Sequence, residues 1–287
     1  MGKVSPRRDK KKFSREVGLE IAALCGEHFL KLKHLHYGYW SNGLEADISN
    51  LKTAQENYTE FLISQVPNNV KKVLDVGCGT GQMSRKLVDM GYQADCVCPS
   101  AFFARNVREL LGSGSEVFEC NYEQLQTERR YDLVLFAESF QYIKPHKALE
   151  KTAGLLNGGG YLLICDIFRN DTLEHSTMSG GHSLRQFYET VGQYDFGAVK
   201  DLDITEETAP NIDIENHILK EVVRPAMSLV QQLLENRYPL ASKILQWRYK
   251  KKIDSLYTKY FSGYRTGENF KKFKSYRVLL YKKSNSG

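Results

Sequence analysis

The sequence predicts an α/β fold built on a doubly wound, mostly parallel, seven-stranded sheet with helices on both faces. Short apolar runs, typical of buried strands, alternate with segments of helical periodicity through the middle of the chain. A glycine-rich turn directly follows the first of these runs, at the place where open parallel sheets bind ligands. An N-terminal helical lid and a helical C-terminal cap insertion are expected to complete the architecture.

The composition is that of an ordinary globular protein. The 287 residues are 41% hydrophobic and 26% charged, so one large core can form without disulfides. No apolar run approaches the roughly 20 residues that span a bilayer, and the basic N-terminus lacks the apolar segment of a secretory signal. We therefore expect a cytoplasmic protein without stable membrane insertion. The cysteines lack zinc spacing and predict reduced thiols and no metal site: Cys25, Cys78, Cys96, Cys98, Cys120 and Cys165.

Composition and periodicity divide the chain into five predicted parts. A basic disordered tail over residues 1–12 precedes the helical lid over 13–66. The core of alternating strands and helices covers 67–170. A cap with the remaining sheet elements covers 171–270, and the last strand and tail cover 271–287.

Ahead of the core, apolar positions at helical spacing predict a helix over 13–32 and a second helix that ends near residue 65. Asp47 or Ser49 is the expected cap of the second helix, because both side chains can accept hydrogen bonds from backbone N–H groups at a helix start. An aromatic cluster lies between the two helices, His34-Leu35-His36-Tyr37-Gly38-Tyr39-Trp40.

Within the core the alternation is regular, and beyond residue 169 it weakens. The core pattern predicts strands over 72–76, 93–98, 116–119, 131–137 and 161–167, helices over 80–90, 102–111 and 146–156, and a turn at 158–160. The later pattern predicts a helix over 183–191, a strand over 198–205, a mostly helical stretch over 212–260 interrupted near Pro225 and Pro239, and a last strand over 275–282.

The strongest motif is a strand that runs into three alternating glycines. Glycine lets the backbone turn sharply and approach a ligand closely, and N–H groups at the start of the next helix can face a carboxylate or phosphate. The pattern D-x-G-x-G-x-G resembles motif I of the S-adenosylmethionine (AdoMet)-dependent methyltransferases with a Rossmann-like fold. The resemblance implies AdoMet as the cofactor, with contacts from Asp75, Gly77, Gly79 and Gly81.

Later segments fall where that family has its next motifs. Asp95 lies at the start or middle of the second strand, so the resemblance places Ser100, or a backbone group beside it, at the ribose. Asn121 follows the third strand, where the family contacts adenine. Glu138 ends the fourth strand, at the edge that faces the methyl-transfer crevice, and is a further cofactor contact. The resemblance covers residues 60 to 168 well and the rest loosely.

The aromatic cluster also carries a resemblance. The order His36-Tyr37-Gly38-Tyr39-Trp40 is similar to a stretch that closes over AdoMet in small-molecule methyltransferases acting on sterols, tocopherols and glycine derivatives. It implies that Tyr37, Tyr39 and Trp40 pack the cofactor and the acceptor. The competing interpretation is an aromatic hinge packed on the core, because aromatic side chains commonly fill cores.

Methyl transfer from a sulfonium depends on orientation, and it needs a general base only where the nucleophile must lose a proton. Glu138 is the base candidate at the carboxyl edge of the sheet, with a hydrogen-bonded helix cap as its alternative. A capping or surface role is the alternative for a loop histidine. The other base candidates are His36 and His182, followed by Asp166 and His175, and the expected acceptor-binding residues are Gln141, Tyr142 and His182.

The acceptor is expected to be a small, apolar or lipid-like molecule, such as an isoprenoid, sterol, quinone or polyketide. It can be anionic or membrane-derived, because the basic stretch 248–252 can receive a phosphate or carboxylate. An RNA methyltransferase is one alternative, but the fourth strand lacks the (Asp/Asn)-Pro-Pro-aromatic motif, so no nucleic-acid partner is expected. A non-catalytic AdoMet-binding protein is another, and Asp75 disfavours a nicotinamide dehydrogenase. Carbon, nitrogen and oxygen all remain open as the methylated atom.

Overall fold

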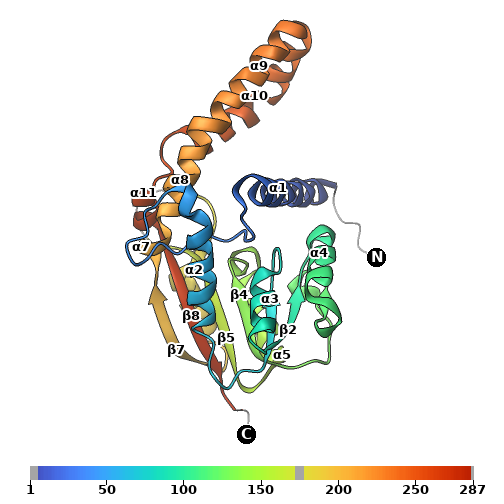
Figure 1. The fold of residues 1–287 in the computed structure, drawn as a ribbon, viewed down its shortest axis with the longest axis vertical. Coiled ribbons are helices and arrows are strands. Elements are labelled where there is room, and N and C mark those ends of the chain that lie inside the picture. Colours follow the sequence, from blue (N-terminus) through green and yellow to red (C-terminus); the bar gives the residue numbers. More distant parts are fainter. Residues whose placement is uncertain (1–5, 172–177, 286–287) are drawn as a thin grey trace.

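The computed structural model describes residues 6–171 and 178–285, and His175 lies outside these ranges. Within them an eight-stranded sheet has the order β3-β2-β1-β4-β5-β8-β7, with β6 paired to β5 (Figure 1). The pairs among β1 to β6 are parallel, whereas β8 lies antiparallel between β5 and β7. The strands are β1 (Lys72–Val76), β2 (Gln93–Val97), β3 (Val117–Phe118), β4 (Tyr131–Ala137), β5 (Leu156–Arg169), β6 (His182–Ser183), β7 (Phe196–Asp203) and β8 (Lys274–Lys283).

The predicted α/β class with a mostly parallel sheet is confirmed. The seven strands of the main path correspond to the seven that the sequence predicts, and β6 is an additional strand of two residues. The strand order reverses at β1, whose neighbours are β2 and β4. The carboxyl ends of β1 and β4 therefore form the switch point at which sheets of this kind bind ligands.

Helices cover both faces of the sheet. Alternate side chains of a strand point to opposite faces, so Val73 and Leu133 join the core under α2 and α3, whereas Leu74 and Val134 join the core under α5 and α6. The helices are α1 (Pro6–Leu30), α2 (Leu51–Ile63), α3 (Gln82–Asp89), α4 (Ala101–Leu111), α5 (Pro145–Leu155), α6 (Leu184–Val191), α7 (Thr205–Thr208), α8 (Pro210–Ile218), α9 (Arg224–Arg237), α10 (Pro239–Phe261) and α11 (Gly267–Phe273).

Two local expectations are corrected. The first helix, predicted over 13–32, is α1 and begins earlier, at Pro6, because proline is favourable in a first helical turn and lysine and arginine are good helix formers. The turn expected at 158–160 lies inside β5. Leu156 pairs with Tyr131, and the next pair joins Tyr161 to Leu133, so the three glycines form an irregular bulge within the strand pairing.

The helical region after α8 projects away from the body of the molecule (Figure 1). Leu219–Val223 form a π-helical turn that leads into α9, so the chain remains helical through Pro225. The break predicted near Pro239 lies at Tyr238, between α9 and α10. The helical insertion predicted as a cap thus divides into α7, α8 and α11 near the sheet and the projecting pair α9 and α10.

Within the described part of the chain, no helix is both long and apolar enough to cross a membrane.

Candidate functional site

A tight turn between β1 and α3 brings three glycines with positive φ to the carboxyl edge of the sheet. The φ angles of Gly77, Gly79 and Gly81 are 78°, 54° and 78°. A Cβ at Gly77 would lie 2.5 Å from the Cβ of Ser139, so this glycine lets the turn pack against the end of β4. A Cβ at Gly79 would have Leu35 Cδ1 at 3.9 Å as its nearest neighbour. The backbone at Gly79 therefore borders open space that a ligand can enter.

Asp75 lies beneath this turn. Its Oδ2 accepts a hydrogen bond from Ser84 Oγ of α3 at 2.5 Å, and its side chain is buried. Burial raises the pKa of Asp75 to about 6, and the Ser84 hydroxyl limits that rise. Asp75 thus ties β1 to α3 under Gly79. Its contact with a cofactor amine stays a prediction.

The residues predicted to contact ribose and adenine follow β2 and β3. The hydroxyl of Ser100 caps the start of α4, and the side-chain amide of Asn121 donates to a glutamine three residues later. Asp95 is held by Arg129 Nη1 at 2.8 Å and by the Tyr131 hydroxyl at 2.9 Å. Tyr131 begins β4, so the Asp95 side chain makes its contacts toward the amino ends of the strands, away from the glycine turn. The ribose and adenine contacts themselves stay predictions.

The segment between α1 and α2 crosses the glycine turn and the end of β4. Thr80 Oγ1, in the turn, donates to the carbonyl of Lys33 at 2.6 Å. The Tyr37 N–H donates to Glu138 Oε1 at 2.8 Å. Asn211 of α8 holds both backbone groups of the glycine that follows Tyr37, at 2.7 and 2.8 Å. These contacts fix the segment over the carboxyl ends of β1 and β4.

The three aromatic residues predicted to cover the cofactor separate in the structure. The Tyr37 ring lies beside Tyr276 of β8, with the ring centroids 6.0 Å apart. Tyr39 stacks on Phe61 of α2 at 4.5 Å, and Trp40 is buried between α2 and α8. Tyr39 and Trp40 therefore occupy the positions that the competing interpretation, a hinge packed on the core, expects of them.

Glu138 has a strained backbone. Its φ of 56° is sparsely populated by residues other than glycine, and such strain clusters at functional sites. Glu138 Oε1 accepts hydrogen bonds from Tyr37 N–H at 2.8 Å and from the Tyr276 hydroxyl at 2.5 Å. Burial raises the pKa of Glu138 to about 7, and these two donors limit the rise. Glu138 can therefore exchange a proton near neutral pH, and its partners are not those of a helix cap.

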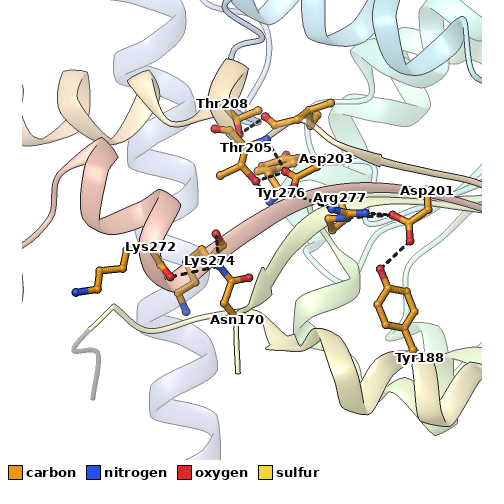
Figure 2. A network of polar contacts seen from close by, with 11 residues as sticks. Asn170, Tyr188, Asp201, Asp203, Thr205, Thr208, Lys272, Lys274, Tyr276 and Arg277 are labelled. Carbon is orange, nitrogen blue, oxygen red and sulfur yellow. Dashed lines mark hydrogen bonds and ion pairs between the residues drawn. The ribbon is translucent and has the colours of Figure 1, made fainter. Parts of the chain in front are cut away.

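Tyr276 is a residue that the sequence interpretation missed. It lies 138 residues after Glu138, on β8, and a polar network around the start of that strand fixes it (Figure 2). The Tyr276 N–H donates to Thr205 Oγ1 at 2.8 Å, and Asn170 Nδ2 donates to the carbonyl of Lys274 at 3.0 Å. The other labelled members of the network are Tyr188, Asp201, Asp203, Thr208, Lys272 and Arg277.

Tyr276→Phe is expected to raise the pKa of Glu138 by roughly one unit, because a hydrogen bond to a charged group is worth about 1.5–3 kcal/mol. Carbon-13 NMR of the glutamate side-chain carboxyl carbons measures the shift without substrate. Tyr58→Phe is the matched control, since the Tyr58 hydroxyl lies 3.1 Å from that of Tyr276 but donates no hydrogen bond to Glu138 in the described contacts. Equal titration of Glu138 in all three proteins would contradict this assignment.

The predicted acceptor residues gather around the turn that follows β4. Asp166, at the end of β5, accepts hydrogen bonds from Gln141 N and Nε2 at 3.0 and 2.9 Å. Burial raises the pKa of Asp166 to about 7, against the pull of these donors. His182 Nε2 lies 2.8 Å from the carbonyl of Ile143, and because a carbonyl can only accept, this contact gives Nε2 the donor role. The role of His182 as a base stays a prediction. Tyr142 exposes its side chain beside them.

His36 is an interior residue. Its Nδ1 lies 2.8 Å from the carbonyl of Tyr37, its Nε2 lies 3.2 Å from Thr59 Oγ1, and its ring stacks on Tyr58 at 4.3 Å. Burial, with a smaller effect of the neighbouring His34, lowers the pKa of His36 to about 3. Both ring nitrogens have partners within the protein, so we do not retain His36 as a base.

Comparison with known proteins decides the family. A family model described as a methyltransferase domain matches residues 50–196, slightly more than half of the chain. The chain belongs to this methyltransferase family. An uncharacterized methyltransferase of Geobacillus kaustophilus is 23% identical over 181 residues, which are 58% of this chain and 84% of the relative.

Solved structures share the fold of this methyltransferase. The cyclase SpnF matches with a TM-score of 0.64 at 17% identity, over 88% of this chain and 87% of that one. Geranyl diphosphate C-methyltransferase from Streptomyces coelicolor A3(2), with Mg²⁺, geranyl diphosphate and S-adenosylhomocysteine, matches with a TM-score of 0.60 at 15% identity, over 90% and 92%. Because the fold serves both a cyclase and a methyltransferase, the argument for function depends on the site.

Proposed function

We propose that this protein binds AdoMet at the carboxyl edge of β1 and β4 and transfers its methyl group to a small-molecule acceptor. One observation carries the proposal: the open glycine turn at Gly79 and the carboxylate of Glu138, whose backbone is strained, lie at the same strand junction, under one segment of chain. Membership of the methyltransferase family supports it. So does the S-adenosylhomocysteine in the structure of the geranyl diphosphate enzyme.

The donor groups at the junction fit such a cofactor. The open space at Gly79 leaves room for a ligand to approach the backbone, and N–H groups at the start of α3 attract a carboxylate. Asp75, Ser100 and Asn121 would hold the amine, the ribose and the adenine. AdoMet, when bound, supplies a methyl group on a positively charged sulfur whose departure leaves a neutral thioether. The Tyr37 ring can attract that positive charge through its π face.

Glu138 would accept the proton of an acceptor whose nucleophilic atom carries one. The Tyr37 N–H and the Tyr276 hydroxyl hold its carboxylate in one orientation, and general-base catalysis is most effective when the pKa of the base lies near the working pH. The segment from Lys33 to Tyr37, anchored at Thr80 and Glu138, would exclude water from this proton transfer. Gln141 and Tyr142, on the turn that follows Glu138, would line the acceptor.

The acceptor we propose is apolar or lipid-like. The aromatic rings of Tyr37 and Tyr142 lie on the two segments that border Glu138, and they offer the acceptor apolar faces. The geranyl diphosphate in the solved structure of the geranyl diphosphate C-methyltransferase is consistent with this class. A hydroxyl, an amine or an activated carbon could each be methylated with Glu138 as the proton acceptor.

A second candidate is a protein that binds AdoMet without transferring the methyl group. The contacts of Glu138 favour this second candidate. Its carboxylate already accepts hydrogen bonds from Tyr37 and Tyr276, so it is occupied within the protein. The sequence relationship to the methyltransferase family favours turnover instead.

Calorimetric titration with AdoMet, S-adenosylhomocysteine and NAD tests the proposal. We expect both adenosyl ligands to bind with dissociation constants on the order of micromolar, and we expect no binding of NAD. Acceptors are then screened by mass spectrometry for a mass gain of one methyl group. If neither adenosyl ligand binds to folded protein, the proposal is wrong. Binding without methylation of any acceptor in a broad apolar library would favour the second candidate.

A further inference from the structure

The projecting hairpin, defined as α9 and α10 over residues 224–261, has an unusual arrangement of polar and apolar side chains. At the seam between its helices, Glu235 Oε1 accepts hydrogen bonds from Gln231 Nε2 at 2.8 Å and from Gln246 Nε2 at 2.7 Å. Gln246 Nε2 also contacts Ser242 Oγ at 3.3 Å. Ser242 is only 6% exposed. Polar side chains thus lie where the two helices meet.

The apolar side chains of the hairpin point outward. Leu240, Ile244 and Trp247 recur at intervals of three and four residues along α10, and their exposed fractions are 77%, 62% and 80%. On α9, Leu229 and Leu233 are 60% and 69% exposed. A helical hairpin surrounded by water buries its apolar stripes and exposes its polar ones. Contiguous exposed apolar surface marks contact with a protein or a membrane.

The charge of the hairpin distinguishes between the two kinds of contact, with a second copy of the protein or with a membrane. Residues 224–261 contain eight lysines and arginines and two carboxylates, a net charge of +6, which equals the net charge of the whole chain. Two copies packed through this surface would bring like charges together, and such juxtaposition disfavours association. An anionic surface would be attracted, because each basic residue near anionic lipids contributes about 1 kcal/mol.

The residue types also match a lipid–water boundary. Trp247, Tyr238 and Tyr249 are exposed on the hairpin, and tryptophan and tyrosine concentrate at membrane interfaces. Arg248 and the lysines over 250–252 are exposed in the same stretch, and their long aliphatic stems can lie along apolar surface while the charges face phosphate groups.

We propose that the hairpin docks on an anionic phospholipid surface, with its apolar stripes in the interfacial layer and its basic residues against the headgroups. The hairpin continues from α8, whose Asn211 holds the segment over Glu138. A docked hairpin would therefore bring the carboxyl edge of the sheet close to the membrane. The docking itself is independent of the proposed methyl transfer.

Sedimentation with vesicles tests this surface in the full-length protein without AdoMet. Vesicles of equal parts phosphatidylglycerol and phosphatidylcholine are compared with vesicles of phosphatidylcholine alone, at low and high salt. We expect the protein to sediment with the anionic vesicles at low salt. Leu240→Ser with Trp247→Ser, and separately Lys250→Glu with Lys251→Glu and Lys252→Glu, should each reduce the bound fraction at least tenfold.

Matched variants carry the same changes elsewhere. Met90→Ser with Val199→Ser replaces two exposed apolar residues outside the hairpin, and Lys71→Glu with Lys72→Glu and Arg130→Glu reverses three charges at the opposite edge of the sheet. Both should bind as the natural protein does, and circular dichroism checks that every variant is folded. Absence of vesicle binding would overturn the proposal. So would a dimer in light scattering that the Leu240→Ser and Trp247→Ser pair dissolves, because a second copy would then cover the hairpin.

Discussion

Gly79→Ala is expected to weaken AdoMet binding by a factor on the order of 100, or about 2.7 kcal/mol. The reason is geometric. The glycine turn offers its backbone to the ligand, and the added Cβ would occupy the open space beside Gly79 through which the ligand approaches. Calorimetric titration of the variant with AdoMet and with S-adenosylhomocysteine measures the loss.

The same variant should lose about 1–2 kcal/mol of stability, which is the cost of an alanine in the left-handed region. Apart from the two adjacent residues, no protein atom lies closer than 3.9 Å to the new Cβ, so no steric clash adds to this cost. Gly91→Ala is the matched control. Gly91 has a φ of 92°, it follows α3 at the end remote from the glycine turn, and its Cβ would also meet open space. The control should lose similar stability and keep its affinity. Unchanged affinity in Gly79→Ala would show that this turn does not hold the cofactor.

Gly77→Ala would not separate binding from folding. Its Cβ would lie 2.5 Å from the Cβ of Ser139 and 3.2 Å from Ser139 Oγ. Because Ser139 Oγ also donates to the carbonyl of Val76, neither side can move away without opening the contact between β1 and β4. A loss of binding in this variant would therefore reflect damage to the strand junction.

The sequence allowed accurate prediction of the elements whose physics is local. The limits of β1 and β4 match the apolar runs that predicted them, because strands buried on both faces are continuous in hydrophobicity. Asp47 caps the helical segment before α2 through its contact with the Ser49 N–H, as its position predicted. The glycine turn was recognisable because the turn requires positive φ at fixed positions, and glycine is the residue that adopts positive φ most readily.

The parts of the site that depend on distant contacts were not predictable in this way. Tyr276 lies on the predicted last strand, but no local signal indicates that its hydroxyl meets Glu138. Asn211 belongs to α8 and contacts a glycine 173 residues earlier. His36 was a candidate base because a histidine side chain can accept a proton near neutral pH. Only its contacts with Thr59 and Tyr58 show that its ring is packed in the interior. The sequence could place these residues on elements, whereas the fold decides which of them meet.

Glu138→Gln is expected to lower the rate of methyl transfer at least 100-fold while making the protein more stable at about pH 8. Glutamine keeps the shape and can still accept the hydrogen bonds from Tyr37 and Tyr276, but it cannot take a proton. In the natural protein, activity should rise as the pH increases through about 7, because Glu138 acts as a base only after it loses its proton. This rise should be absent from the variant.

The effect on stability follows from the same raised pKa. Between the ordinary glutamate pKa of about 4.3 and the folded value of about 7, the folded protein holds a proton that the unfolded chain has lost. The contribution of Glu138 to stability is therefore fully present below about pH 4 and is lost as the pH rises through about 7. Glutamine removes this loss. The free energy of unfolding of the variant, measured with urea, should therefore rise relative to that of the natural protein between about pH 5 and pH 8.

Asp132→Asn is the control at the opposite end of β4. Although burial acts against it, the N–H groups of Lys72 and Lys71 and the Asn157 side chain hold the pKa of Asp132 below its ordinary value. Its contribution to stability has the opposite sign, because it is present above about pH 4 and is lost on acidification. Asp132→Asn should therefore destabilise the protein at neutral pH without changing the pH dependence of methyl transfer. If the Glu138→Gln protein keeps both the activity and the pH profile, Glu138 is not the base. Catalysis would then depend on the orientation of cofactor and acceptor alone.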